Sequence, residues 1–184
     1  MLINSSKLFC NPKESIYQTK VISENLNDTK LVFTFGNEGN WLIKNLNLNI
    51  ANINIPVIND EMARRWWDGL MTFYQMRETV IKEIEKKNEI IIITNKLFGF
   101  YVGFILSLVS LLTKRNKKII VITSFSTKNN TQVLDSLALK ATIYDVMKTK
   151  EYKDELALNP SLLELDNCLN RIYLEKLKNA FDMS

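Results

Sequence analysis

The chain has 184 residues, 46% of them hydrophobic, which is enough for one domain with a sizeable core and too few for two. Charged residues make up 24%, and the net charge of +4 is spread over many lysines, so composition alone supports nucleic-acid binding only weakly. The absence of histidine excludes Ser-His and Cys-His dyads and removes the commonest metal ligand. Cys10 and Cys168 have no CxxC spacing, so we expect no disulfide framework, zinc site or cofactor, and a reducing, cytoplasmic setting.

The first 28 residues are expected to be an N-terminal helical segment. The stretch KESIYQTKVISENL (13–26) predicts an opening helix. MLINSSKLFC has no basic stretch followed by an apolar run, so it does not have the pattern of a signal peptide.

Strand and helix patterns alternate along the rest of the chain. The predicted strands are KLVFTF (30–35), NINIPVI (52–58), EIIIIT (89–94), KKIIVIT (117–123) and ATIYDV (141–146). The predicted helices are 39–50, one long or broken helix over 58–87 capped by Asn59 or Asp60, 102–113, 129–140, and a C-terminal helix over 160–182. The four consecutive isoleucines of EIIIIT are typical of a strand covered on both faces, so we expect it to be central. The uncharged run 97–112 is shorter than the ~20 residues of a membrane span, which favours a buried helix and no membrane contact.

Strands separated by helices of about a dozen residues indicate right-handed crossovers and a parallel sheet. We therefore predict one α/β domain over residues 1–184. It is a three-layer, doubly wound, five-stranded parallel sheet with the flavodoxin-like order 2-1-3-4-5. In such sheets ligands lie beyond the carboxyl ends of the strands, where the strand order reverses. That position falls between FGNEGN (35–40) and TNKLFGF (94–100).

The corner FGNEGN has two interpretations. Gly36 and Gly39 lie between a strand and a helix start, where backbone amides and the helix dipole can bind an anion. Alternatively, the glycines only permit a positive φ in a tight turn. Two glycines do not make a GxGxxG fingerprint, and the carboxylate of Glu38 would repel a phosphate.

Two long stretches resemble a sugar isomerase (SIS) domain. The first, KLVFTFGNEGNWLIKNLNLNIANINIPVINDE, is similar to that family's opening strand, GxGxS turn, helix, strand and acidic residue. The second, which runs from NEIIIIT through KIIVITS to ATIYDV, is similar to its SxSGxT loop and the strands that follow. With the closing helix, the resemblance covers residues 28–181. This chain differs from the motifs by a glutamate at position 38, an asparagine at position 40 and a longer loop over 94–100.

The resemblance implies a SIS-like fold with altered loops, which either bind a small anionic or sugar-phosphate ligand weakly or have lost binding and persist as an association module. Lys96 supplies a positive charge to this pocket, and hydroxyl groups line the segment after the fourth strand, where they also fit a helix N-cap region. The implied ligand-binding residues are Gly36, Asn37, Glu38, Asn40, Thr94, Asn95, Lys96, Thr123, Ser124, Ser126 and Thr127. We assign no catalytic residue.

Aromatic residues follow the second and third strands. Trp66 and Trp67, next to Arg64 and Arg65, fit a sugar-stacking or nucleic-acid surface, but we favour a subunit interface or a core anchor because tryptophans bury large areas. The stripe Phe98, Phe100, Tyr101 and Phe104 is expected in the core or at a dimer seam. We therefore expect a homo-oligomer.

Three functional hypotheses follow. The first, which we favour, is a sensor resembling the effector domain of RpiR-type transcription regulators, with no direct DNA binding because about thirty residues precede the first strand. The second is a phosphosugar isomerase, for which Glu38 and Glu61 are the candidate bases. The third is a nucleotide-binding remnant of the FtsZ/tubulin GTPase fold, because FGNEGNWLIKNL followed by IPVIND resembles that family's first glycine loop and second strand.

Overall fold

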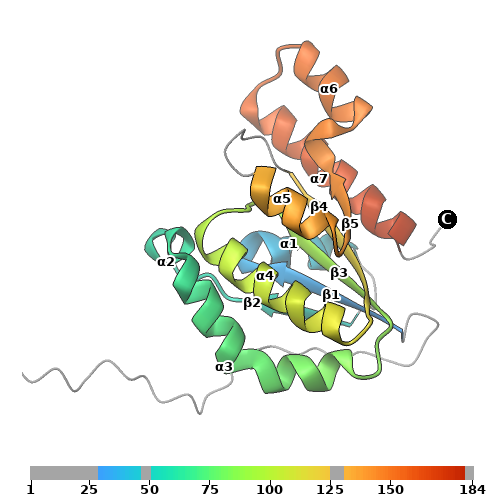
Figure 1. Cartoon of the computed structure of the whole chain (residues 1–184). Coiled ribbons are helices and arrows are strands. Elements are labelled where there is room, and N and C mark those ends of the chain that lie inside the picture. Colours follow the sequence, from blue (N-terminus) through green and yellow to red (C-terminus); the bar gives the residue numbers. More distant parts are fainter. Residues whose placement is uncertain (1–28, 47–50, 125–130, 181–184) are drawn as a thin grey trace, which may run out of the picture.

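A five-stranded parallel sheet forms the centre of the protein (Figure 1). The computed structural model describes residues 29–46, 51–124 and 131–180. The strands are β1 (Lys30–Phe35), β2 (Asn52–Ile55), β3 (Glu89–Thr94), β4 (Lys118–Thr123) and β5 (Thr142–Asp145). They lie in the order β2-β1-β3-β4-β5, and each neighbouring pair is parallel. The predicted fold class and strand order are therefore confirmed.

β3 is the middle strand of the sheet. Its run of isoleucines makes both of its faces apolar, which suits a strand covered by helices on both sides. All of its residues are buried, and so are those of β4 after Lys118. The two strands pair in register from Glu89 opposite Lys118 to Thr94 opposite Thr123. At the sheet edge, β5 alternates between exposed and half-buried residues. The isoleucine run in β3 thus predicted the centre of the sheet correctly.

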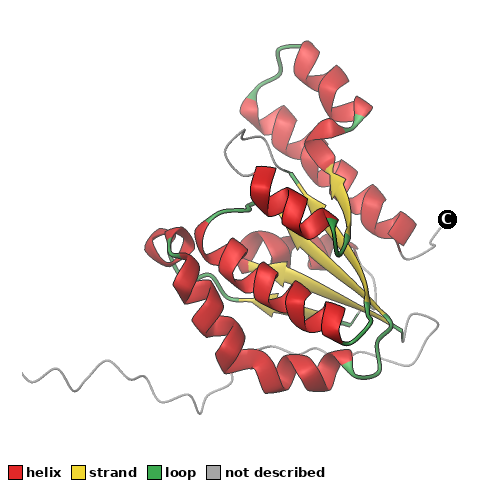
Figure 2. Ribbon diagram, viewed as in Figure 1, coloured by secondary structure: helices red, strands yellow, loops and turns green. Residues whose placement is uncertain are grey.

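Helices cover both faces of the sheet (Figure 2). They are α1 (Gly36–Leu46), α2 (Asp60–Arg64), α3 (Trp66–Ile84), α4 (Gly99–Lys114), α5 (Thr131–Ala138), the short 3-10 helix η2 (Val146–Lys148), α6 (Lys150–Ala157) and α7 (Leu162–Ala180). Buried residues of α3, α4 and α5 pack against one face of the sheet, which includes Ile90 and Ile92. Buried residues of α1, α6 and α7 pack against the other face, which includes Ile91 and Ile93. Because both faces of the sheet are covered by apolar side chains, polar side chains can lie together only at the ends of the strands.

The apolar helix α4 packs against both α3 and the sheet. Phe100, Phe104 and Leu108 are fully buried. A methyl group added at Gly103 would overlap the carbonyl oxygen of Trp66, so α3 and α4 cross in close contact. The core interpretation of this aromatic stretch is confirmed for the residues inside the helix. In the described part of the chain, no helix combines the length and the apolar character needed to cross a membrane.

Several predicted boundaries are shifted. The helix expected over 58–87 is broken at Arg65, whose extended backbone (φ −102°, ψ 112°) separates α2 from α3. Asn59 is the cap of α2, because its side chain accepts a hydrogen bond from the backbone N–H of Met62 at 2.8 Å. The second strand ends at Ile55, and α4 begins at Gly99, before the expected start.

Two elements after β5 were not predicted. The side chain of Asp145 accepts a hydrogen bond from the N–H of Met147 at 3.2 Å and begins η2. Thr149 then accepts one from the N–H of Tyr152 at 3.3 Å and begins α6. These capping contacts organise a polar stretch without apolar periodicity. The helix expected over 13–26 lies outside the described residues, and the single-domain assignment stays a prediction.

Candidate functional site

The corner after β1 is shaped by its two glycines for different reasons. Gly36 has a positive φ of 60°, so the chain leaves the strand in a conformation that favours glycine and enters α1 at once. Gly39 packs α1 onto the sheet, because a Cβ there would lie 2.6 Å from the Cβ of Thr34 and 2.8 Å from Oδ1 of Asn54. Thr34 donates a hydrogen bond to that same Oδ1 at 2.9 Å. Gly39 is therefore a packing residue.

The corner after β3 is held by its own backbone and by α2. The hydroxyl of Thr94 donates to the carbonyl of Lys96 at 2.7 Å and accepts from the N–H of Lys96 at 3.1 Å. Gly99 has a φ of 47°, and a Cβ at this position would overlap the backbone of Ala63 and Arg64. Leu97 is fully buried between these two contacts. The Thr94 hydroxyl therefore fixes this turn, and its contact with a ligand stays a prediction.

The two corners touch each other through side chains. The amide of Asn95 donates a hydrogen bond to Oε2 of Glu38. The ammonium of Lys96 lies 3.5 Å from Oε1 of the same carboxylate, and it lies 6.0 Å from the centre of the Tyr101 ring. Segments separated by more than fifty residues thus meet at the carboxyl end of the sheet. The predicted juxtaposition of 35–40 and 94–100 holds, and Glu38 is its centre.

The ring of Tyr101 lies below Lys96, and its hydroxyl group is uncharged. It is buried, and its ring packs against those of Phe35 and Phe98. Burial, followed by the nearby carboxylates of Glu38 and Asp60, raises the pKa of Tyr101 to about 12. At neutral pH the Tyr101 hydroxyl therefore keeps its proton.

The ends of β3, β4 and β5 bring a further row of polar groups to the same edge. The register places Thr94 beside Thr123, and Thr123 beside Asp145. Thr123 is fully buried, and its hydroxyl has no hydrogen-bond partner among the described residues. Ser124 follows it and lies close enough to the Tyr173 hydroxyl of α7 to influence the pKa of that group. Ser126 and Thr127, also predicted to bind a ligand, lie outside the described residues.

Tyr173 ties α7 to the carboxyl end of β3. Its hydroxyl donates a hydrogen bond to the carbonyl of Thr94 at 3.2 Å. Burial raises the pKa of Tyr173, and the nearby polar groups of Ser124 lower it by less. Tyr173 lies in the predicted C-terminal helix and was not among the predicted site residues. No local sequence pattern indicates that the Tyr173 hydroxyl reaches the carboxyl end of the sheet. Asp145, in contrast, lies at the end of a predicted strand, and that position could have identified it as a candidate site residue.

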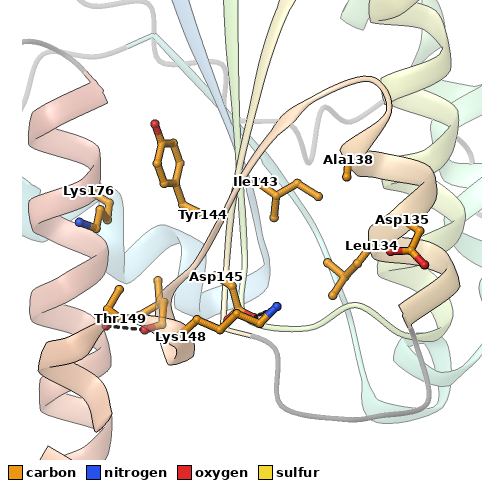
Figure 3. A pocket seen from close by; sticks show the side chains of 10 residues that line it. Leu134, Asp135, Ala138, Ile143, Tyr144, Asp145, Lys148, Thr149 and Lys176 are labelled. Atoms are coloured by element: carbon orange, nitrogen blue, oxygen red, sulfur yellow. Dashed lines mark hydrogen bonds and ion pairs between the residues drawn. The ribbon is translucent and has the colours of Figure 1, made fainter. Parts of the chain in front are cut away.

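A hollow of about 470 Å³ lies beside the edge strand β5 (Figure 3). In it Ile143 points toward α5 and Tyr144 toward α7, while Lys148 lies 3.5 Å from the carboxylate of Asp145. The lining residues are Leu134, Asp135, Ala138, Ile143, Tyr144, Asp145, Val146, Lys148, Thr149 and Lys176. This hollow is separate from the Glu38 contact and was not predicted. Among the described residues, no cluster of three or more His, Cys, Asp or Glu side chains could hold a metal ion.

Comparison with known proteins gives structural likeness without sequence likeness. No protein-family model matches the sequence, and no curated protein sequence matches it significantly. Among solved structures, CetZ from Methanosaeta thermophila strain DSM 6194 superposes with a TM-score of 0.55 and 16% identity, covering 84% of this chain and 54% of CetZ. TubZ of Clostridium botulinum phage c-st gives a TM-score of 0.50 and 9% identity, covering 79% of this chain and 67% of TubZ. The chain thus spans about half the length of CetZ.

CetZ and TubZ are tubulin/FtsZ-like proteins, which corrects the family expected from the sequence. The resemblance to a SIS domain, and with it the RpiR-type regulator, is wrong. The misleading segments were KIIVITS and NEIIIIT, because apolar strands followed by hydroxyl residues suit any buried parallel sheet. Of the three functional hypotheses, the comparisons favour the FtsZ/tubulin-like one. At these identities the likeness establishes a shared fold, and this chain has that fold around its five-stranded sheet.

Proposed function

We propose that this chain is a tubulin/FtsZ-like domain whose nucleotide corner is closed by its own glutamate, so that it acts through association with other proteins and not through turnover. The observation that carries the proposal is the contact of the Glu38 carboxylate with Asn95 and Lys96. Ligands of open α/β sheets bind at this edge, beside the turn that begins α1. In this chain the carboxylate of Glu38 already occupies that position at the carboxyl end of the sheet.

Electrostatics explain why a bound phosphate and Glu38 exclude each other. Two unit negative charges about 4 Å apart repel by about 4 kcal/mol at an effective dielectric constant of 20. For as long as Glu38 stays in this contact, that energy corresponds to a loss of roughly a thousandfold in affinity. Lys96, the cation of this corner, is also already paired with Glu38. A nucleotide would therefore have to displace Glu38 from both of its partners.

A second candidate is a domain that binds nucleotide after Glu38 turns outward. It is favoured by the exposure of the pair, since the side chain of Glu38 is 60% exposed and that of Lys96 is 38% exposed. Exposed ion pairs of this kind stabilise a fold by less than about 1 kcal/mol. The two candidates differ in whether the wild-type chain binds nucleotide.

Calorimetric titration with GTP and Mg²⁺ distinguishes the two candidates. We expect no binding by the wild-type chain up to about 1 mM GTP, and weak but measurable binding by Glu38→Gln, which removes the charge and keeps the size. Glu164→Gln is the matched control, because Glu164 also lies in the first turn of a helix and accepts hydrogen bonds there, from Ser161. Binding of GTP by the wild type at low micromolar concentration would reject the closed corner in favour of the second candidate.

A further inference from the structure

Helix α3 carries an apolar stripe on its outer face. Trp67, Met71 and Tyr74 follow at helical spacing and are 51%, 54% and 60% exposed, and Trp66 beside them is 53% exposed. The opposite side of α3, with Phe73 and Met76, is buried against α4 and the sheet. In Figure 1, α3 runs along the flank of the molecule, with α4 on its inner side. We call Trp67, Met71 and Tyr74 the α3 stripe.

The apolar area of this face is what a small dimer needs. A Trp, Met or Tyr side chain that is half exposed offers roughly 100 Å² to a partner, so the α3 stripe and Trp66 offer about 400 Å². A standard interface buries about 800 Å² on each partner, and a little over half of that is apolar. The largest apolar patch on a typical monomeric protein is about 300–600 Å² and is often functional, so this face is comparable to such a patch.

The charges at the two ends of the α3 stripe make it complementary to itself. Arg64, the exposed last residue of α2, precedes the stripe, and the exposed Glu78 follows it. Within α3 the stripe and Glu78 follow at spacings of four, three and four residues, and Arg64 lies at the amino end of α3, before the break at Arg65. Such spacing forms a straight seam on a helix. A second copy running in the opposite direction would place opposite charges at both ends of the seam.

We propose that the partner of this face is a second copy of the chain, packed through antiparallel α3 helices. Met71 then lies at the two-fold axis, Trp67 meets Tyr74 of the second copy, and Arg64 meets Glu78 of the second copy. A two-fold interface uses the same patch on both subunits, so one self-complementary stripe is sufficient. This proposal is independent of whether the Glu38 corner holds a nucleotide. It also gives Trp66 and Trp67 the interface role expected from the sequence.

Sedimentation equilibrium tests the dimer directly. We expect the wild-type chain to be a dimer at about 100 µM, and Met71→Lys to weaken dimerisation at least about a hundredfold, because two ammonium groups would be buried at the axis. Leu163→Lys is the matched control, since Leu163 is also exposed, at 70%, but lies in the first turn of α7, far along the chain from α3. A monomeric wild type, a dimer unaffected by Met71→Lys, or a dimer lost in Leu163→Lys would each overturn the proposal. Thermal unfolding of each variant confirms that it is folded.

A charge swap tests the antiparallel direction. Arg64→Glu alone and Glu78→Arg alone each place like charges together twice in the dimer, so each should weaken dimerisation about tenfold. The double variant Arg64→Glu/Glu78→Arg restores both pairs, and it should dimerise within about threefold of the wild type. An equimolar mixture of the two single variants should form a mixed dimer for the same reason. Additive loss in the double variant would overturn the antiparallel arrangement.

Discussion

The two ends of the central sheet both hold a glutamate next to lysine, but they differ in burial. At the amino end, the side chain of Glu89 is 10% exposed and bridges Lys118 and Lys30, the latter at 3.6 Å. At the carboxyl end, the side chain of Glu38 is 60% exposed and lies 3.5 Å from Lys96. A charge contact removed from water is costly to break, whereas an exposed one stabilises the fold only slightly. The amino end is therefore part of the scaffold, and the carboxyl end can change at little cost.

Rigidity at the carboxyl end comes from backbone packing and not from its charges. Gly99 lies directly against the backbone of α2, and Tyr173 holds the last carbonyl of β3 from α7. The contact of Glu38 with Asn95 and Lys96 adds little to this rigid frame of backbone packing. The same frame can therefore present either an internal carboxylate or the phosphate of a ligand.

The largest expected effect is at Gly99. Gly99→Ala should lower the free energy of unfolding by at least about 3 kcal/mol, because the new methyl group overlaps α2 and the positive φ is strained. Gly36→Ala is the matched comparison, with a similar φ but open space up to 3.8 Å around the new carbon, and should cost about 1 kcal/mol. Urea unfolding measures both. Equal losses would mean that close packing does not fix the corner after β3.

The next effect compares the two glutamates directly. Glu89→Gln should destabilise the fold by about 2 kcal/mol, because it leaves the ammonium of Lys30 near a buried neutral group. Glu38→Gln should change stability by less than about 0.5 kcal/mol, since its pair is exposed. Chemical unfolding at neutral pH and moderate salt gives both values. The distinction between the two ends fails if Glu38→Gln is the more destabilising substitution.

The last effect is a loss of stability that appears only at alkaline pH. The pKa of Tyr101 is raised from 10.0 to about 12, so the folded state holds the proton more tightly than the unfolded state. This contribution is complete below pH 10, is lost as the pH rises toward 12, and amounts to about 3 kcal/mol at most. Tyr101→Phe should make the loss of stability with rising pH less steep. The loss that remains should come from Tyr173, which is also buried and whose pKa is also raised. Unfolding midpoints measured across this range check the slope, which should not change in Tyr101→Phe if Tyr101 ionises normally.

The architecture could be predicted from the sequence because the spacing of apolar residues distinguishes strands from helices. The buried runs of β3 and β4 identified the central strands, and helices of crossover length between the strands required a parallel sheet. The elements η2 and α6 were missed because side-chain caps at Asp145 and Thr149 define them, in a stretch without apolar periodicity. The family was misjudged because its cues were those of any buried parallel sheet.

The candidate site was predictable in position but not in chemistry. The topology rule brought the corners of Gly36 and Gly99 to the same end of the sheet. That Glu38 would be bound by Asn95 and Lys96 depends on side-chain directions across two loops, which no local pattern specifies. The arrival of the Tyr173 hydroxyl from α7 depends in the same way on how the last helix packs. Whether Ser124 and its neighbours contact a ligand stays a prediction.

The most direct test of the closed corner is a crystal structure of the chain grown with GTP and Mg²⁺ in large excess. We expect the carboxylate of Glu38 to contact Asn95 and Lys96 as it does here, with no nucleotide beside Gly36. A nucleotide whose phosphates lie against residues 36–39, with Glu38 turned away, would contradict the account.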